Sequence, residues 1–142
     1  MSDSLVARLS PTDFEQVARL VLPAPSYGWI ASGSADEQSM HENVAAFRRW
    51  RLNAGVMVDV RKIDLGTTVQ GVPIAFPVMV APMGLQKVAH PEGEMGTAAG
   101  VAATGSLFVE AVNATTSMED IAARHPKMPF WLQLYNLSLI HI

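Results

Sequence analysis

The sequence contains no cysteine. It can therefore form no disulfide, no thiolate metal site and no cysteine nucleophile. Positive charge is not in excess either, because ten lysines and arginines stand against thirteen aspartates and glutamates, for a net charge of −3. This balance argues against a nucleic-acid-binding surface, which requires a basic excess.

Long apolar runs are absent as well. No run reaches the ~20 residues that a membrane-spanning helix needs, and Met1–Ser4 lack the basic start of a secretory signal. We therefore expect a cytoplasmic protein without a membrane segment. Phosphate-binding loops of the Walker or G-x-G-x-x-G type are missing, and no group of His, Asp and Glu has the spacing of metal ligands.

Apolar residues, in contrast, are plentiful. They make up 49% of the 142 residues, and charged residues make up only 16%. This proportion is high for a small soluble domain. It indicates that part of the apolar surface is covered by chain that these residues do not include.

One stretch organises the rest of the chain. Pro77–Ala81 is a continuous apolar run, which is typical of a strand buried on both faces of a parallel sheet. Pro82 and Gly84 then form a turn at the carboxyl end of that strand, where ligands bind in β/α barrels and open α/β sheets. Gly84 also leaves the backbone open to a flat ligand. An ordinary strand-to-helix turn remains the alternative.

The order of expected elements is helices, a hairpin, and then alternating strands and helices. The alternation implies a parallel sheet with right-handed crossovers. The expected helices span about 11–22, 27–32, 35–51, 90–105 and 116–124; the hairpin spans 67–74; the strands span about 56–60, 78–81, 107–111 and 129–135.

Several caps and faces are predicted as well. Ser34 with Glu37, and Thr116 with Glu119, have the spacing of capping boxes, and Gly33 has the position of a left-handed helix cap. Glu110, near the end of the second barrel strand, is expected to point outward or into a loop. The residues expected to face inward from the third and fourth helices are Met40, Val44 and Phe47, and Met95, Ala98, Ala99 and Ala102.

Much of the chain resembles a known family. Ala81–Glu94, which reads APMGLQKVAHPEGE, is similar to the first barrel strand and loop of the FMN-dependent L-2-hydroxy acid oxidases and dehydrogenases, such as glycolate oxidase, lactate oxidase and lactate monooxygenase. The likeness runs in order from about Phe14 to Tyr135. Its further segments are 31–33, 36–37, 42–43 with Phe47, 63–71 and 131–135.

The resemblance implies a fold and a cofactor. The fold is α/β, the N-terminal part of a TIM (β/α)₈ barrel, with about three barrel strands preceded by helices and a β-hairpin. The cofactor is FMN. The residues placed against it are Pro82, Met83, Gly84, Ala111 and Gln133. Gly84 replaces an alanine common in the family and leaves more room beside the flavin, while Ala111 replaces a flavin-contacting serine.

Two further positions match substrate-binding residues of the family. Trp29 stands where a tyrosine commonly binds the substrate carboxylate, and Tyr135 matches a tyrosine that meets the substrate. Gln133 and Tyr135 are two residues apart and point the same way on a strand. For Trp29 a place in the core, and for Gln133 a buried water or a mutual hydrogen bond, remain alternatives. Asn113, where some members have an aromatic wall, implies a different pocket.

The implied reaction is oxidation of a small L-2-hydroxy acid to the 2-keto acid, with oxygen or another electron acceptor. No catalytic residue falls within this sequence, because the family's histidine base and substrate-binding arginines lie in later strands. The chain alone is therefore expected to be inactive, and the full-length parent to be a homo-oligomer. The alternatives are a non-catalytic small α/β binding module and an FMN barrel with different chemistry.

The last six residues do not fit the family. Residues 137–142 read LSLIHI, which is one reading frame of a common sequencing-adapter end, CTG TCT CTT ATA CAC ATC. We therefore expect residues 1–136 to be the N-terminal portion of the barrel enzyme and residues 137–142 to be an artefactual tail.

Overall fold

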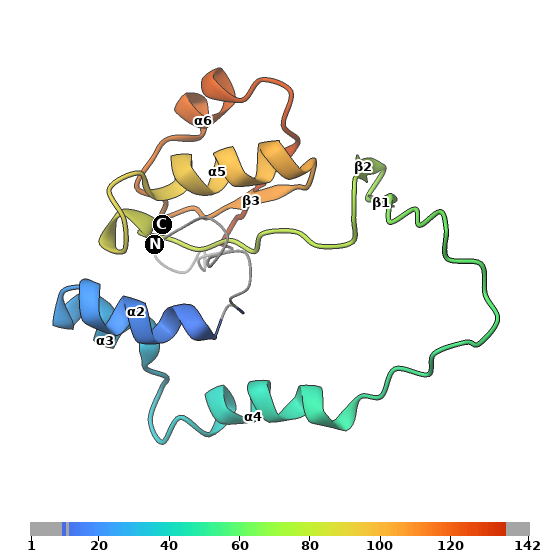
Figure 1. Cartoon of the computed structure of the whole chain (residues 1–142). Helices are drawn as coiled ribbons and strands as arrows, with labels where there is room; N and C mark the ends of the chain where they lie inside the picture. The colour runs from blue at the N-terminus through green and yellow to red at the C-terminus, as the bar shows by residue number, and fades with distance from the viewer. Residues whose placement is uncertain (1–9, 11, 136–142) are drawn as a thin grey trace. The chain divides into compact units, whose positions relative to one another are not determined.

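A computed structural model describes residue 10 and residues 12–135. These residues belong to two compact units, which divide between Asp59 and Val60 (Figure 1). Each unit is described by itself below. The expected tail at 137–142 lies outside the described residues.

The first unit is helical. Its elements are α2 (Asp13–Val21), α3 (Ala24–Ala31), α4 (Gln38–Ala46) and the short 3₁₀ helix η1 (Phe47–Arg49) (Figure 1). The three helices predicted here are confirmed. The extended run predicted at residues 56–60 forms no strand.

The start of α2 depends on a reciprocal contact with Ser10. The Asp13 carboxylate accepts hydrogen bonds from the backbone N–H of Ser10 at 2.7 Å and from its hydroxyl at 2.8 Å. The Asp13 N–H in turn donates to the Ser10 carbonyl at 3.0 Å. The hydroxyl contact, and then the backbone contact, lower the pKa of Asp13.

The link between α3 and α4 differs from the prediction. Gly33 is not left-handed; α3 ends at Ser32 with an extended ψ of 153°. The left-handed residues are instead Ala35 and Glu37, at φ 51° and 60°. The Glu37 carboxylate accepts from the Gly33 N–H at 3.0 Å, so it cannot complete a capping box with Ser34. Both expectations were wrong because the Glu37 carboxylate binds the N–H of Gly33, one residue before the Ser34 N–H that a capping box would use.

The apolar face of α4 is not buried. Val44 and Phe47 are exposed, and only Met40 is partly covered. Within the described part of this unit α2 and α3 pack on each other, whereas α4 mainly contacts η1, its own continuation. The predicted inward face is therefore wrong here, because among the described residues of this unit no other element packs extensively against it.

The second unit begins with a β-hairpin. β1 (Thr67–Val69) pairs with β2 (Val72–Ile74) in antiparallel register. Gln70 and Gly71 both have positive φ, at 49° and 80°, which is the backbone of a two-residue type I′ turn. The predicted hairpin is confirmed.

A parallel pair of strands follows. β3 (Phe108–Glu110) pairs with β4 (Phe130–Leu132), with Phe108 opposite Phe130. The predicted first barrel strand is reduced to one parallel bridge from Val80 to Phe108. Its hydrogen bonds are Val80 N–H to the Leu107 carbonyl and Val109 N–H to the Val80 carbonyl, both 3.1 Å. The predicted parallel order is thus present, and the described residues form no closed barrel.

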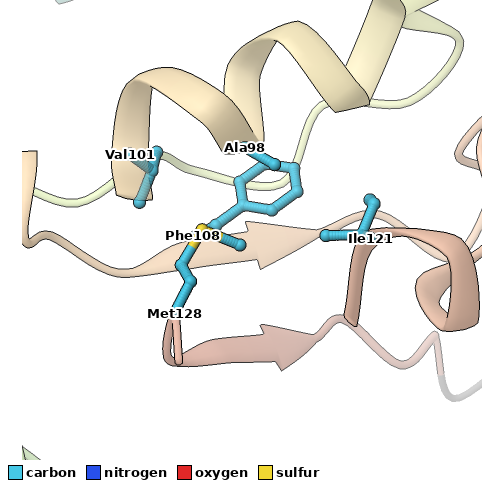
Figure 2. Packing of buried hydrophobic residues seen from close by; sticks show 5 residues of the cluster. All are labelled: Ala98, Val101, Phe108, Ile121 and Met128. Atoms are coloured by element: carbon cyan, nitrogen blue, oxygen red, sulfur yellow. The ribbon is translucent and has the colours of Figure 1, made fainter. Parts of the chain in front are cut away.

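Helices α5 (Gly93–Thr104) and α6 (Met118–Arg124) supply the core with β3. Figure 2 shows side chains from both helices and from the strand pointing toward one another. The residues of this core are Ala98, Val101, Phe108, Ile121 and Met128. Ala98 and Met95 were predicted to face inward. Both predictions are confirmed, because Ala98 belongs to the core and Met95 packs against it. Ala99 and Ala102 are exposed, since α5 is turned so that Val101 faces inward.

The cap of α6 lies one residue later than predicted. The Ser117 hydroxyl accepts from the Asp120 N–H at 3.2 Å and therefore caps the helix. Thr116, the predicted cap, donates its hydroxyl to Glu94 instead, at 3.0 Å. The predicted Thr116–Glu119 box was wrong because a buried carboxylate competes for the threonine.

Candidate functional site

The loop after the first strand is held by its own side chains. The Gln86 amide donates to the Met83 carbonyl at 3.2 Å, and its oxygen accepts from the Thr97 hydroxyl at 2.5 Å. Leu85 is left-handed, at φ 56°, and its N–H donates to the Asn113 carbonyl at 3.2 Å. These contacts fix the backbone that Pro82, Met83 and Gly84 would present to a ligand. Gln86 begins the short 3₁₀ helix η2 (Gln86–Val88).

The space beside Gly84 is not empty. A Cβ at Gly84 would overlap the carboxamide of Asn113. The expected extra room is therefore filled by Asn113, which comes from the loop after β3. Glycine permits this close approach of the Asn113 side chain.

Gln133 carries an unpaired polar atom. Its N–H donates to the Glu110 carbonyl at 2.8 Å, which continues the β3–β4 ladder. Its side-chain oxygen Oε1 is buried and has no partner among the described residues. Buried polar atoms are normally paired, so this oxygen fits a ligand that offers a donor. The alternative of a mutual hydrogen bond with Tyr135 is not formed.

The other predicted residues are placed as follows. Ala111 is buried immediately after β3 and lies on the same face as Gln133, by the alternation of a strand. Tyr135 is 52% exposed. Trp29 lies in α3 of the first unit and is 57% exposed, so it is not part of a core within that unit. Within the second unit the structure thus brings Gly84 to Asn113 and Ala111 to Gln133.

Glu94, which the sequence analysis missed, is fully buried in the first turn of α5. Burial, the largest influence, acts to raise the pKa of its carboxyl. The hydrogen bonds from the hydroxyl and N–H of Thr115, with further backbone contacts, outweigh it and lower the pKa to about 2. Glu94 is therefore ionised at neutral pH. The available signal was the pair of threonines in the loop between β3 and α6, since their hydroxyls need acceptors.

Glu110 corrects an expectation. Its side chain is buried, at 1% exposed, and does not reach solvent as an outward or loop-facing charge would. Its Oε2 has no hydrogen-bond partner among the described residues. Burial, followed by the negative charges of Glu94 and Glu119, raises the pKa of the Glu110 carboxyl. It points toward α5 because it shares the face of Phe108 on β3.

A cleft of about 430 Å³ lies between α5 and α6. The basic side chains of Lys87 and Arg124 border it, together with His125 and Glu92. Across residue 10 and residues 12–135, no three His, Asp or Glu side chains are grouped to hold a metal ion. No helix in the same residues is long and apolar enough to span a membrane.

Comparisons with known proteins agree on one family. Residues 18–139 match the family described as FMN-dependent dehydrogenase. Glycolate oxidase 1 of Zea mays is 42% identical over 123 residues, which cover 87% of this chain and 33% of that protein. Glycolate oxidase 5 of Oryza sativa subsp. japonica is 40% identical over 124 residues, with the same two coverages.

Solved structures agree as well. The lactate oxidase of Pediococcus acidilactici superposes with a TM-score of 0.82 at 35% identity, over 87% of this chain and 34% of that one. A soluble mutant of (S)-mandelate dehydrogenase from Pseudomonas putida gives a TM-score of 0.83 at 28% identity, over 89% and 36%.

The chain thus spans about a third of the length of the relatives it matches. These neighbours are TIM barrels, and the described residues form an open α/β portion of one, as the resemblance implied. On the family match and these likenesses, the chain belongs to the FMN-dependent dehydrogenase family, whose cofactor is FMN.

Proposed function

We propose that this chain is the N-terminal part of an enzyme that oxidises an L-2-hydroxy acid to the 2-keto acid. Family membership supports this reaction class. The relatives' names support it too, because glycolate, lactate and mandelate are all 2-hydroxy acids. The observation in this chain that carries the proposal is the buried, unpaired Oε1 of Gln133, since the pyrimidine edge of a flavin offers the N–H donor that this oxygen lacks.

Each proposed contact has a distinct role. The backbone of Pro82, Met83 and Gly84 supports the flat ring, and the fixed conformation of their loop supports this assignment. Ala111 lies beside Gln133 and offers only a methyl group, so it adds packing and no hydroxyl contact. FMN supplies the redox chemistry when it is bound, and the protein supplies binding and orientation.

Trp29 and Tyr135 are proposed to meet the substrate. The indole N–H can donate to a substrate carboxylate but cannot accept, and the tyrosine hydroxyl can do both. No catalytic residue is assigned within this chain. The proton-accepting base and the cationic groups for the substrate carboxylate are assigned to the part of the enzyme that follows it, and oxygen or another acceptor takes up the electrons.

The proposed boundaries are residues 1–136 for the barrel portion and 137–142 for an artefactual tail. The family match continues to residue 139. Sequencing the parent genomic DNA through codon 136 tests the boundary, and a frame that encodes LSLIHI there disproves the artefact.

A chimera tests the function. Residues 1–136 would replace the matched part of glycolate oxidase 1 of Zea mays; a related chimera is described as active in the case of (S)-mandelate dehydrogenase. We expect the chimera to purify yellow and to oxidise glycolate or lactate. Gln133→Leu should raise the Kd for FMN by about tenfold, because it removes a hydrogen bond to the ligand.

The matched control is Gln38→Leu on the exposed first turn of α4. It should leave the Kd for FMN unchanged. A folded chimera that is colourless and has no affinity for FMN would overturn the proposal.

A further inference from the structure

The Glu94 carboxylate joins two loops that are distant in the sequence. Oε1 accepts from the Gln86 N–H at 3.1 Å and from the Thr115 N–H at 2.9 Å. Oε2 accepts from the Thr115 hydroxyl at 2.5 Å and from the Thr116 hydroxyl at 3.0 Å. Four donors thus surround one fully buried carboxylate.

The two loops follow neighbouring parallel strands. Gln86 belongs to the loop after the Val80 bridge, and Thr115 belongs to the loop after β3. A second contact runs between the same loops, from the Leu85 N–H to the Asn113 carbonyl at 3.2 Å. A third joins the Lys87 ammonium to the Thr115 carbonyl at 3.3 Å. Glu94 is the buried centre of this set.

We propose that Glu94 is a positioning residue for FMN. Glu94 holds both loops to the first turn of α5. It thereby fixes the position in which the backbone of residues 82–84 contacts the flavin ring. The inference rests on the proposed function, which places 82–84 against that ring. Glu94 itself is fully buried, so its proposed role is exerted through the loop.

The four hydrogen bonds allow the role of Glu94 to be tested by a substitution that keeps the volume of its side chain. The two N–H partners, of Gln86 and Thr115, can only donate, and both meet Oε1, whereas the two threonine hydroxyls at Oε2 can donate or accept. Glu94→Gln keeps the shape but removes the negative charge, which weakens the hydrogen bonds from the two N–H groups, and its NH₂ group requires both hydroxyls to turn and accept. The clamp should therefore open while the helix that carries it remains.

The experiment compares variants of the chimera defined above. Glu94→Gln should raise the Kd for FMN by about tenfold or more. Glu92→Gln, two residues earlier and exposed, is the matched control and should leave the Kd unchanged. Val101→Ala, which removes core volume from the same helix without touching either loop, should lower Tm while the Kd changes by less than about twofold.

Two conservative substitutions of Thr115 test whether its hydroxyl is responsible for the effect on FMN binding. Thr115→Val should weaken FMN binding because it removes the donor to Oε2, and Thr115→Ser, which keeps the hydroxyl, should restore it. If Glu94→Gln weakens FMN binding no more than Val101→Ala at an equal loss of Tm, Glu94 acts through stability alone and the inference is overturned.

Hydrogen exchange in the flavin-free chimera gives a readout that does not depend on the proposed function. The amides of Gln86 and Thr115 should exchange at least about tenfold faster in Glu94→Gln, with the amide of Val101 unchanged. Unchanged exchange at both amides would refute the clamp. A chimera that binds no FMN but shows the accelerated exchange would instead refute the proposed function and leave the clamp standing.

Discussion

Glu94, at the start of α5, and Glu110, at the end of β3, show how the surroundings of a glutamate determine its pKa. Both are buried. Glu94 receives four hydrogen bonds, whereas Oε2 of Glu110 receives none from the described residues. Their pKa values accordingly move in opposite directions, down to about 2 for Glu94 and upward for Glu110. The contribution of Glu94 to stability is thus present above the ordinary glutamate pKa and is lost as the pH falls toward 2.

The opposite sign applies to Glu110 and yields a prediction. Its stabilising contribution is complete below the ordinary pKa of glutamate and is lost as the pH rises through the higher pKa of the folded protein. At pH 7 its carboxylate therefore destabilises the fold. Glu110→Gln in the chimera should raise the free energy of unfolding at pH 7 by about 1 kcal/mol, and the gain should vanish near pH 4. Urea denaturation at both pH values measures it.

The control for this prediction is Glu92→Gln, at the exposed start of α5, because the charge of Glu92 is not among the causes of the raised pKa of Glu110. It should change stability by less than about 0.5 kcal/mol. An equal gain for Glu110→Gln at both pH values would contradict the argument, because the effect would then not depend on ionisation.

At the scale of elements, helix α5 has a sharply defined end. Gly105 is left-handed at φ 67°, and a Cβ there would lie 3.2 Å from that of Ala75. Gly100, in the middle of the same helix, has open space around its Cα. Gly105→Ala should therefore cost about 1 kcal/mol or more, whereas Gly100→Ala should stabilise by roughly 0.5–1 kcal/mol. Denaturant titration of the two chimera variants measures both.

The same substitution at two sites serves as its own control. If Gly105→Ala and Gly100→Ala changed the free energy of unfolding in the same direction, backbone conformation would not decide the outcome.

The elements that local chemistry determines were predictable. Gly71 indicates a hairpin turn and Gly105 indicates a helix end, because glycine adopts the positive φ that each position has without steric cost. The order of parallel strands also followed from the alternation of patterns. The predicted Thr116 cap was wrong because the carboxylate of Glu94, 22 residues earlier in the sequence, accepts the hydrogen bond of the Thr116 hydroxyl. No local pattern encodes such a competition.

Burial was harder to predict than element type. Ala99 and Val101 are both small apolar residues of α5, and only tertiary packing decides which of them faces Phe108. Glu94 and Glu110 violate the rule that charges stay exposed. For the candidate site, the sequence supplied the family and the residues at the strand tips. It could not supply the approach of Asn113 to Gly84, which joins two loops.

At the scale of the whole molecule, the described strands have open edges. The segment around Val80 makes one bridge only, and β4 pairs with β3 on one side. Leu132 and Leu134 near that edge are exposed. Unpaired, apolar strand edges are templates for aggregation, and a complete barrel of this kind needs ~250 residues. Within the described residues the sheet therefore lacks the strand pairing that it requires.

We accordingly predict that the purified 142-residue chain aggregates or melts without cooperativity, and that it produces no hydrogen peroxide from lactate or glycolate with added FMN. The physical reason is that three strand tips cannot enclose a flavin or exclude water around it. Size-exclusion chromatography, thermal melting and a peroxide assay test these points, with the chimera as positive control. A monomer that melts cooperatively without flavin would favour a self-contained binding module, and flavin-dependent peroxide from the chain alone would show that the catalytic groups are already present within it.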